Sequence, residues 1–236
     1  MFDLTKTYTD PDQQYPLRHP GNNNLHLHYD ETFERLPLMR NKGPFVREYL
    51  SDLKRTIDLA LAEYPRLLAF RVDLRLPRGI DLPAHAYTNE VISRFFESFA
   101  KKIRYHQNKV RERNGFAHGC KVRYVWSKET GGSRQHYHLL ILVNRDAYYT
   151  IGRLGSKGGN IVSRIEASWA GALGLSVSQA RGLVEIPDNA EYRVDRRVRR
   201  GDVDELPALF YRASYLCKMA TKSYGDRQKG FGSSKG

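Results

Sequence analysis

The chain has 236 residues, of which 40% are hydrophobic, so it can bury a core and fold as one domain with an N-terminal extension. No apolar stretch approaches the roughly 18 residues of a membrane-spanning helix, and no leader is expected at the N-terminus. The two cysteines lie far apart, which excludes a disulfide scaffold, so we expect an intracellular protein with reduced thiols. A net charge of +13 favours a polyanionic partner, and nucleic acid is preferred to a membrane surface because no basic helix carries a Trp/Leu face.

The chain begins with an arm and a helix. Residues 1–43 are rich in Asp, Asn, Pro, Gly and His without periodicity, which indicates a poorly ordered or extended arm with a small share in the fold. Residues 44–64 predict a helix, with Pro44 suited to its first turn. Its apolar positions recur near helical spacing: Phe45, Tyr49, Leu53, Ile57 and Leu61.

A strand and a long helix follow. Residues 67–76 alternate between apolar and charged side chains, which is typical of a strand. One face has Phe70, Val72, Leu74 and Leu76, and the other has Arg71, Asp73 and Arg75. Residues 88–113 predict a helix with Thr88 as its N-cap. Its buried stripe consists of Val91, Ile92, Phe95, Phe96, Phe99 and Ile103.

The middle of the chain predicts a hairpin and further short elements. Residues 121–127 form a strand with Val122, Tyr124 and Trp126 on one face, and a turn at 131–133 connects it to the apolar strand 136–143. The remaining elements are expected in this order: a helix at 160–173, a short strand at 183–186, and a basic hairpin or loop through residue 200. This order predicts an α+β fold in which helices cover mainly one face of an antiparallel sheet and leave the other face for a site.

Residues 207–222 predict a late helix with two different faces. At about 100° per residue, Tyr211, Tyr215, Lys218 and Lys222 fall on one side, while the opposite side is small or apolar. One face would therefore pack against the protein, and the other would display two phenols and two ammonium groups.

Two histidines stand at the start of the apolar strand. Residues i and i+2 of a strand point the same way, so His136 and His138 can reach one metal ion while Tyr137 turns into the opposite layer. A second pair, His26 and His28, lies in the polar arm without a following apolar strand and is not expected to bind a metal.

These motifs together resemble the HUH endonucleases that start rolling-circle replication. The resemblance narrows to the replication initiators of filamentous phages (inoviruses) and their prophage homologues, and it covers about residues 45–234. It is carried by Phe70 to Pro77, His136 to Tyr149, Tyr211 to Lys218 and Lys222 to Asp226. It implies a Rep-type, ferredoxin-like strand-helix-strand-strand core in an endonuclease domain of residues 44–236, with the tyrosine-bearing helix at the site.

The resemblance implies a divalent metal ion, Mg²⁺ or Mn²⁺. His136 and His138 match the paired ligands, and Glu129 matches the acidic third ligand of many such sites. Gln135 or Asp73 can supply the third oxygen instead, so this position stays open. Imidazole ligands suit Mn²⁺ better than Mg²⁺.

Tyr215 matches the family's nucleophile, and Lys218 matches its usual partner one turn later. Tyr211, at the i, i+4 spacing, is either a second nucleophile or a residue that stacks on a base. The lysine that some members have before the tyrosine is Ser214 here, which weakens the first of these roles.

The implied function is metal-dependent nicking and joining of single-stranded DNA at a replication origin, through a 5′-phosphotyrosine intermediate. A host helicase and polymerase would act as partners, because no nucleotide-hydrolysis motif is present, and the protein would work in the cytoplasm of a bacterial host. The alternatives are a prophage DNA-binding regulator that does not cut, and an HUH transposase or relaxase.

Overall fold

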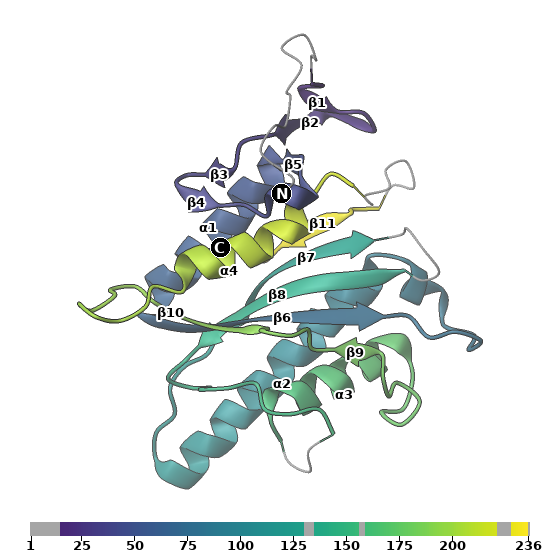
Figure 1. Cartoon of the computed structure of the whole chain (residues 1–236). Coiled ribbons are helices and arrows are strands. Elements are labelled where there is room, and N and C mark those ends of the chain that lie inside the picture. Colours follow the sequence, from purple (N-terminus) through teal and green to yellow (C-terminus); the bar gives the residue numbers. More distant parts are fainter. Residues whose placement is uncertain (1–14, 130–134, 156–158, 221–227, 236) are drawn as a thin grey trace, which may run out of the picture.

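The computed structural model describes residues 15–129, 135–155, 159–220 and 228–235, and its centre is a six-stranded antiparallel sheet (Figure 1). The order across the sheet is β10 (Glu191–Asp195), β6 (Arg66–Arg75), β8 (His136–Asn144), β7 (Arg123–Glu129) and β11 (Phe231–Ser233). The sixth strand, β9 (Val184–Glu185), pairs with β6. The α+β class with an antiparallel sheet is confirmed, and β7 and β8 pair as the hairpin expected from the sequence.

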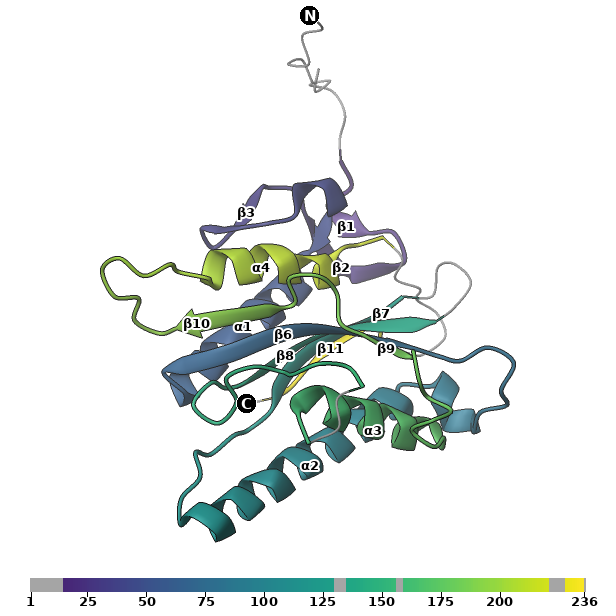
Figure 2. The same cartoon turned by 60° about the horizontal axis from the view of Figure 1, so that its bottom comes forward.

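Helices cover both faces of this sheet, which corrects the prediction of mainly one-sided coverage. Helices α2 (Glu90–Asn114) and α3 (Ile161–Leu173) lie on one face, and α1 (Arg47–Glu63) and α4 (Leu206–Ser214) lie on the other (Figure 2). None of these four helices is long and apolar enough to cross a membrane, nor is any other helix in the described ranges.

The sequence of β6 explains this difference. In the second half of β6, Arg71 and Asp73 give the strand one polar face. In its first half, Leu67 and Ala69 point to that same face and belong to the core with α1 and α4. The same change occurs along β8, where the histidines give way to Leu140 and Leu142. One face of the sheet is therefore core at one end and polar at the other.

The opposite face carries the larger apolar core, and here the sequence predictions hold. All six residues of the predicted stripe on α2 are buried. The aromatic side chains of Trp126, Tyr137 and Trp169 meet beneath the hairpin. Tyr137 is fully buried in this layer, on the side away from the two histidines. The expected cap is wrong by one residue: Asn89 is the N-cap of α2, and Thr88 precedes it, where its hydroxyl accepts from the backbone NH of Glu90 at 3.2 Å.

The arm takes a larger part in the fold than its composition predicts. Its described part contains four short strands: β1 (Arg18–His19), β2 (Asn22–His28), β3 (Thr32–Phe33) and β4 (Leu36–Pro37). Phe33, Leu38 and Met39 are buried in the core that includes α4, and the ring of Phe33 stacks on that of Phe210. The predicted helix start at residue 44 is also too early, because β5 (Phe45–Val46) pairs with β2 before α1 begins.

The predicted continuous helix over 207–222 is wrong in its second half. Helix α4 ends at Ser214, residues Tyr215–Cys217 form a 3-10 turn, and Lys218 is extended. The backbone of this segment is held by the chain near residue 45: Lys218 bridges Phe45, and the Met219 NH donates to the Pro44 carbonyl at 2.9 Å. These long-range bonds replace the helical ones. Lys222 lies outside the described residues.

The C-terminal strand β11 closes the edge of the sheet over a tryptophan. Gly232 stands opposite Trp126 in the register, and a Cβ at Gly232 would lie 2.7 Å from the indole ring. We expect Gly232→Ala to lower the free energy of unfolding by about 1–3 kcal/mol, because the buried ring has to move. Denaturant titration measures this change. Gly171→Ala is the control, because its Cβ meets nothing within 4 Å and lies in α3, so the helix should become no less stable. Equal stability of both variants would contradict the expectation.

Candidate metal centre

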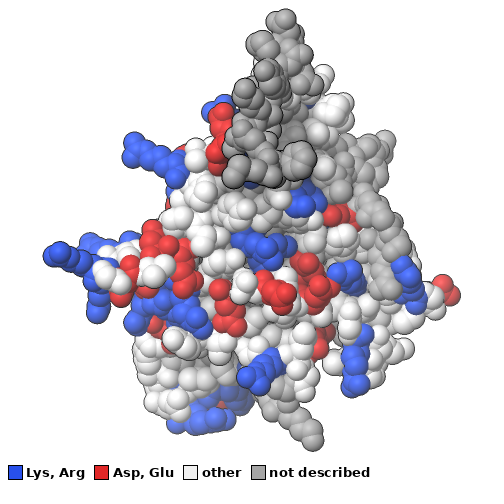
Figure 3. All heavy atoms as spheres, viewed as in Figure 1, with Lys and Arg blue, Asp and Glu red and all other residues white. Residues whose placement is uncertain are grey.

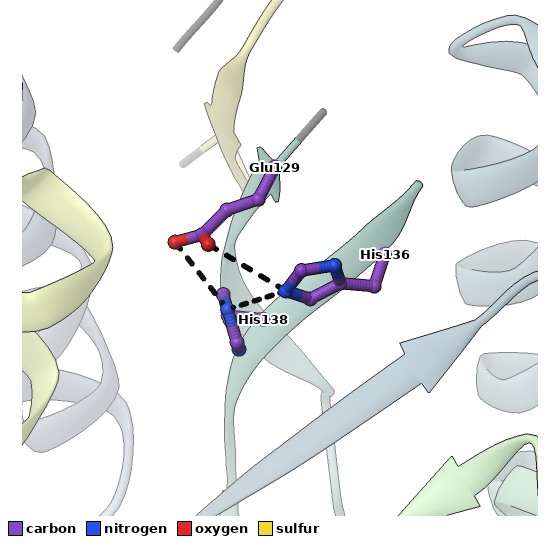
Figure 4. Close-up of side chains that lie close together, drawn as sticks. All are labelled: Glu129, His136 and His138. Atoms are coloured by element: carbon purple, nitrogen blue, oxygen red, sulfur yellow. Dashed lines mark hydrogen bonds and ion pairs between the residues drawn. The ribbon is translucent and has the colours of Figure 1, made fainter. Parts of the chain in front are cut away.

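The hairpin of β7 and β8 brings three metal-ligating side chains together. Glu129 stands directly opposite His136 in the register, and His138 lies two residues further on the same face. The two Nε2 atoms of the histidines are 3.1 Å apart. The carboxylate oxygens of Glu129 lie 3.5 Å from His136 Nε2 and 3.4 Å from His138 Nε2 (Figure 4). These three residues form a group that can hold one metal ion.

Asp73 lies behind His138 instead of facing the ion position. It is the cross-strand neighbour of His138, and its Oδ1 is 2.7 Å from His138 Nδ1. A carboxylate at this distance accepts the Nδ1 proton, so the Nε2 lone pair faces the other two ligands. Burial alone would raise the pKa of Asp73, but the hydrogen bond and charge of His138 and the charge of Arg71 outweigh it and lower the pKa.

The structure therefore separates the three candidates for the oxygen ligand. Gln135 donates from Nε2 to the Tyr137 hydroxyl at 3.1 Å, on the side of the other layer. Asp73 holds the outer nitrogen of His138, and only Glu129 joins the imidazoles in the group. Burial would raise the pKa of Glu129, but hydrogen bonds from His136, His138 and Lys218 outweigh it and lower the pKa, so the ligand is anionic at neutral pH.

The donor set fits a divalent ion. Ligands about 2.1 Å from an octahedral ion stand about 3 Å from one another, and the three donor separations, 3.1, 3.4 and 3.5 Å, are close to this value. Two neutral imidazoles and one carboxylate leave positions open for water or a substrate oxygen. Imidazole nitrogen favours Mn²⁺ over Mg²⁺, as the sequence indicated.

Tyr215 and Lys218 lie beside this group. Lys218 Nζ is 2.7 Å from Glu129 Oε1 and donates to the Tyr215 hydroxyl at 2.7 Å, so one ammonium group joins a metal ligand to a phenol. The Tyr215 ring stands edge-on to His138, with 5.1 Å between ring centroids. Burial would lower the pKa of Lys218, but its bonds to Glu129 and Tyr215 outweigh it and raise the pKa, so this side chain stays charged.

Tyr211 points to a different environment from Tyr215. Its side chain is 42% exposed and lines a groove with Pro37 and Tyr192. The break between α4 and the 3-10 turn causes this divergence, because the two tyrosines no longer share one helical face. Among the described residues, the interactions of the metal group include Tyr215 but not Tyr211.

Arg71 is a site residue to which sequence reasoning gave no role. Its guanidinium is almost fully buried, with Nη2 3.4 Å from Asp73 Oδ1 and Cζ 5.4 Å from the centroid of the Tyr215 ring. Burial lowers the pKa of Arg71, and the charge of Asp73 partly offsets this. The alternation along β6 predicts that Arg71 lies on its polar face. Its contact with Tyr215 joins residues distant in the sequence and could not be predicted from that pattern.

The role of Asp73 can be tested by an isosteric change. We expect Asp73→Asn to weaken Mn²⁺ binding about 10- to 100-fold, because an outer carboxylate fixes the tautomer and raises the basicity of a ligating histidine. Titration followed by the electron paramagnetic resonance of free Mn²⁺ measures the affinity. Asp195→Asn is the matched control, since Asp195 also pairs with an arginine on this sheet but at its other end. Equal Mn²⁺ affinity in both variants would rule out this role.

Comparison with known proteins places most of the chain in one group of sequences. Residues 28–234 match the family model described as the YagK/YfjJ C-terminal domain. Uncharacterized protein YagK of Escherichia coli K12 is 32% identical over 199 residues, which cover 81% of this chain and 94% of that protein. Uncharacterized protein YfjJ of the same strain is 30% identical over 202 residues, which cover 82% and 97%. No solved structure matches the chain.

Proposed function

The chain belongs to the YagK/YfjJ C-terminal domain family, and we propose that it is a metal-dependent DNA nicking and joining enzyme that uses Tyr215 as its nucleophile. The observation that carries the proposal is the contact chain from Glu129 through Lys218 to the Tyr215 hydroxyl, with both distances 2.7 Å. A structural tyrosine needs no such connection to a group of metal ligands.

The side chains of the site suit attack on a phosphodiester. A phenol ordinarily holds its proton at neutral pH, and the Lys218 ammonium would stabilise the phenolate oxygen after the proton has left. A divalent ion held by Glu129, His136 and His138 would neutralise phosphate charge and lower the barrier to attack. The phenol proton passes to solvent, the Tyr215 oxygen bonds to phosphorus while the bond to the 3′ oxygen breaks, and the leaving 3′ oxygen takes up a proton from solvent. The products are a 5′-phosphotyrosine and a free 3′-OH, and the covalent link retains the energy needed for rejoining.

Single-stranded DNA is the proposed substrate. The net charge of +13 attracts a polyanion. The groove lined by Tyr192 and Tyr211 offers aromatic rings, and such rings stack on unpaired bases. Initiation of rolling-circle replication of a filamentous phage or prophage, with a host helicase and polymerase, is the role that the HUH resemblance suggests for this chemistry.

Trapping of the covalent intermediate tests the proposal. The protein is incubated with Mn²⁺ and a pool of 3′-labelled single-stranded oligonucleotides of random sequence, and the products are separated on a denaturing gel. The expected result is a labelled band that migrates with the protein, disappears with EDTA and yields a preferred sequence. Absence of any adduct would overturn the proposal and favour a DNA-binding regulator. Recovery of transposon ends or plasmid transfer origins would instead indicate a transposase or relaxase.

A further inference from the structure

A cleft rich in arginine lies at the end of the sheet opposite the metal group. It has a volume of about 870 Å³ and lies where β6 begins and where β8 and β10 end. Blue side chains gather there, on the left of Figure 3, over the loop that connects β10 to α4 in Figure 1. The metal group stands at the other end of β7 and β8.

The arginines of the cleft fall into two sets. The walls are fixed by internal partners: Arg66 pairs with Asp146 at 2.5 Å, and Arg145 pairs with Asp195 at 2.6 Å. Arg196 donates to the carbonyls of residues 61 and 62, which anchors the start of the loop on the end of α1. These contacts leave the walls nearly neutral and give the loop a fixed base.

The second set lies on the loop after β10: Arg197 and Arg199 line the cleft, and Arg200 follows Arg199 in the same loop. All three are exposed, and within the described ranges their side chains have no hydrogen-bond or ion-pair partner. Asp202, whose backbone NH donates to the carbonyl of Arg199, also lines the cleft, and the other two acids of the lining are the partners of Arg66 and Arg145. The lining contains five arginines and three aspartates, so the cleft presents net positive charge. Guanidinium is the cation best suited to bind phosphate oxygens with two parallel bonds.

We propose that this cleft binds the phosphate backbone of duplex DNA that flanks the cleavage site. Its described lining contains no aromatic side chain. Binding of unpaired bases relies on aromatic stacking, whereas a duplex hides its bases and offers phosphates. The groove with Tyr192 and Tyr211 has the opposite composition and suits the single strand.

The sheet sets the distance between the two contacts. Strand β8 has nine residues and runs from the histidines to the cleft, and the eight steps between its first and last residue, at about 3.3 Å each, give a length of about 26 Å. At 3.4 Å per base pair along one strand, this corresponds to about 8 base pairs. The inference of a DNA partner rests on the proposed function, but the cleft itself can be tested without cleavage.

The test compares two triple variants that lower the net charge equally. Arg197→Ala/Arg199→Ala/Arg200→Ala removes the free set. The control, Arg94→Ala/Lys101→Ala/Lys109→Ala, removes three cations of α2 that are paired with glutamates. Binding of a fluorescent 20-base-pair duplex is measured by anisotropy over a range of salt concentrations. The plot of log K, the association constant, against log salt has a negative slope. Its magnitude should decrease by about 2.7 in the loop variant, or about 0.9 for each lost phosphate contact, and by much less in the control.

A second measurement separates this inference from the proposed function. Adduct formation on a short single-stranded oligonucleotide should be the same in the loop variant and the wild type, because the cleft is remote from Tyr215. Absence of adduct in both proteins with the slope change present would refute the nicking proposal alone. Equal slopes in both triple variants would overturn the duplex site. An equal loss on single strands of the same length would also overturn it.

Discussion

Replacement of Tyr215 by phenylalanine should abolish the covalent DNA adduct and lower nicking on the order of 10³-fold or more. The change removes only the hydroxyl that accepts the 2.7 Å bond from Lys218 and keeps the ring against His138. The loss of one hydrogen bond costs about 1 kcal/mol, so the variant should fold. Labelled oligonucleotide, Mn²⁺ and a denaturing gel provide the measurement, with the rate of adduct formation as the readout.

Tyr211→Phe is the matched control, because it makes the same chemical change four residues earlier. Its hydroxyl lies in the separate groove with Pro37 and Tyr192, so a single cleavage should proceed at close to the wild-type rate. An adduct that persists in the Tyr215 variant and vanishes in the Tyr211 variant would reverse the assignment. Loss in both variants would mean that the two phenols act together in the first cleavage.

Removal of both imidazoles should strongly weaken metal binding. We expect His136→Ala/His138→Ala to weaken Mn²⁺ binding by more than about 100-fold, since loss of an outer partner alone costs about 10- to 100-fold. Isothermal titration measures the affinity directly. Thermal unfolding gives a second readout, because an ion at 100 times its dissociation constant stabilises the native state by about 2.7 kcal/mol. The melting temperature of the wild type should therefore rise with Mn²⁺, and that of the variant should not.

The chain contains its own control for this experiment. His26 and His28 have the same spacing on β2, but His26 pairs with Glu48 and His28 contacts the Thr32 carbonyl. His26→Ala/His28→Ala should leave the Mn²⁺ affinity unchanged within a few-fold. A comparable loss in this second variant would show that metal binds through several histidines and would remove the basis for a defined centre.

The strands and the larger apolar core, with α2 and α3, were predictable from the sequence because period-2 and period-3.6 patterns indicate which residues are buried. The alternation along β6 and β7 placed Phe70, Val72 and Trp126 on the correct face. Glu129 was one of three oxygen ligands that the sequence left open, suggested by the family resemblance, and the short hairpin makes it the cross-strand neighbour of His136. Local patterns of this kind need no knowledge of distant contacts.

Other features depend on contacts between segments far apart in the chain. Helix α4 stops at Ser214 because the residues after it bond to the chain at Pro44 and Phe45, more than 170 positions earlier. The angular pattern of 207–222 assumed an uninterrupted helix and therefore joined Tyr211 to Tyr215. The buried contact between Arg71 and the Tyr215 ring is likewise set by tertiary packing, for which one sequence carries no periodic signal.

The face of the sheet beneath α1 and α4 has an evolutionary consequence. Leu140 and Leu142 belong to the core that also contains the apolar residues of α1 and α4, and His136 and His138 lie on the same strand and the same face. A substitution in this core that shifts α4 also moves Tyr215, which directly follows α4, relative to the metal ligands. Stability and the proposed reactivity are therefore coupled in this fold, and laboratory selection for heat resistance at these leucines should change the rate of the proposed adduct formation at the same time.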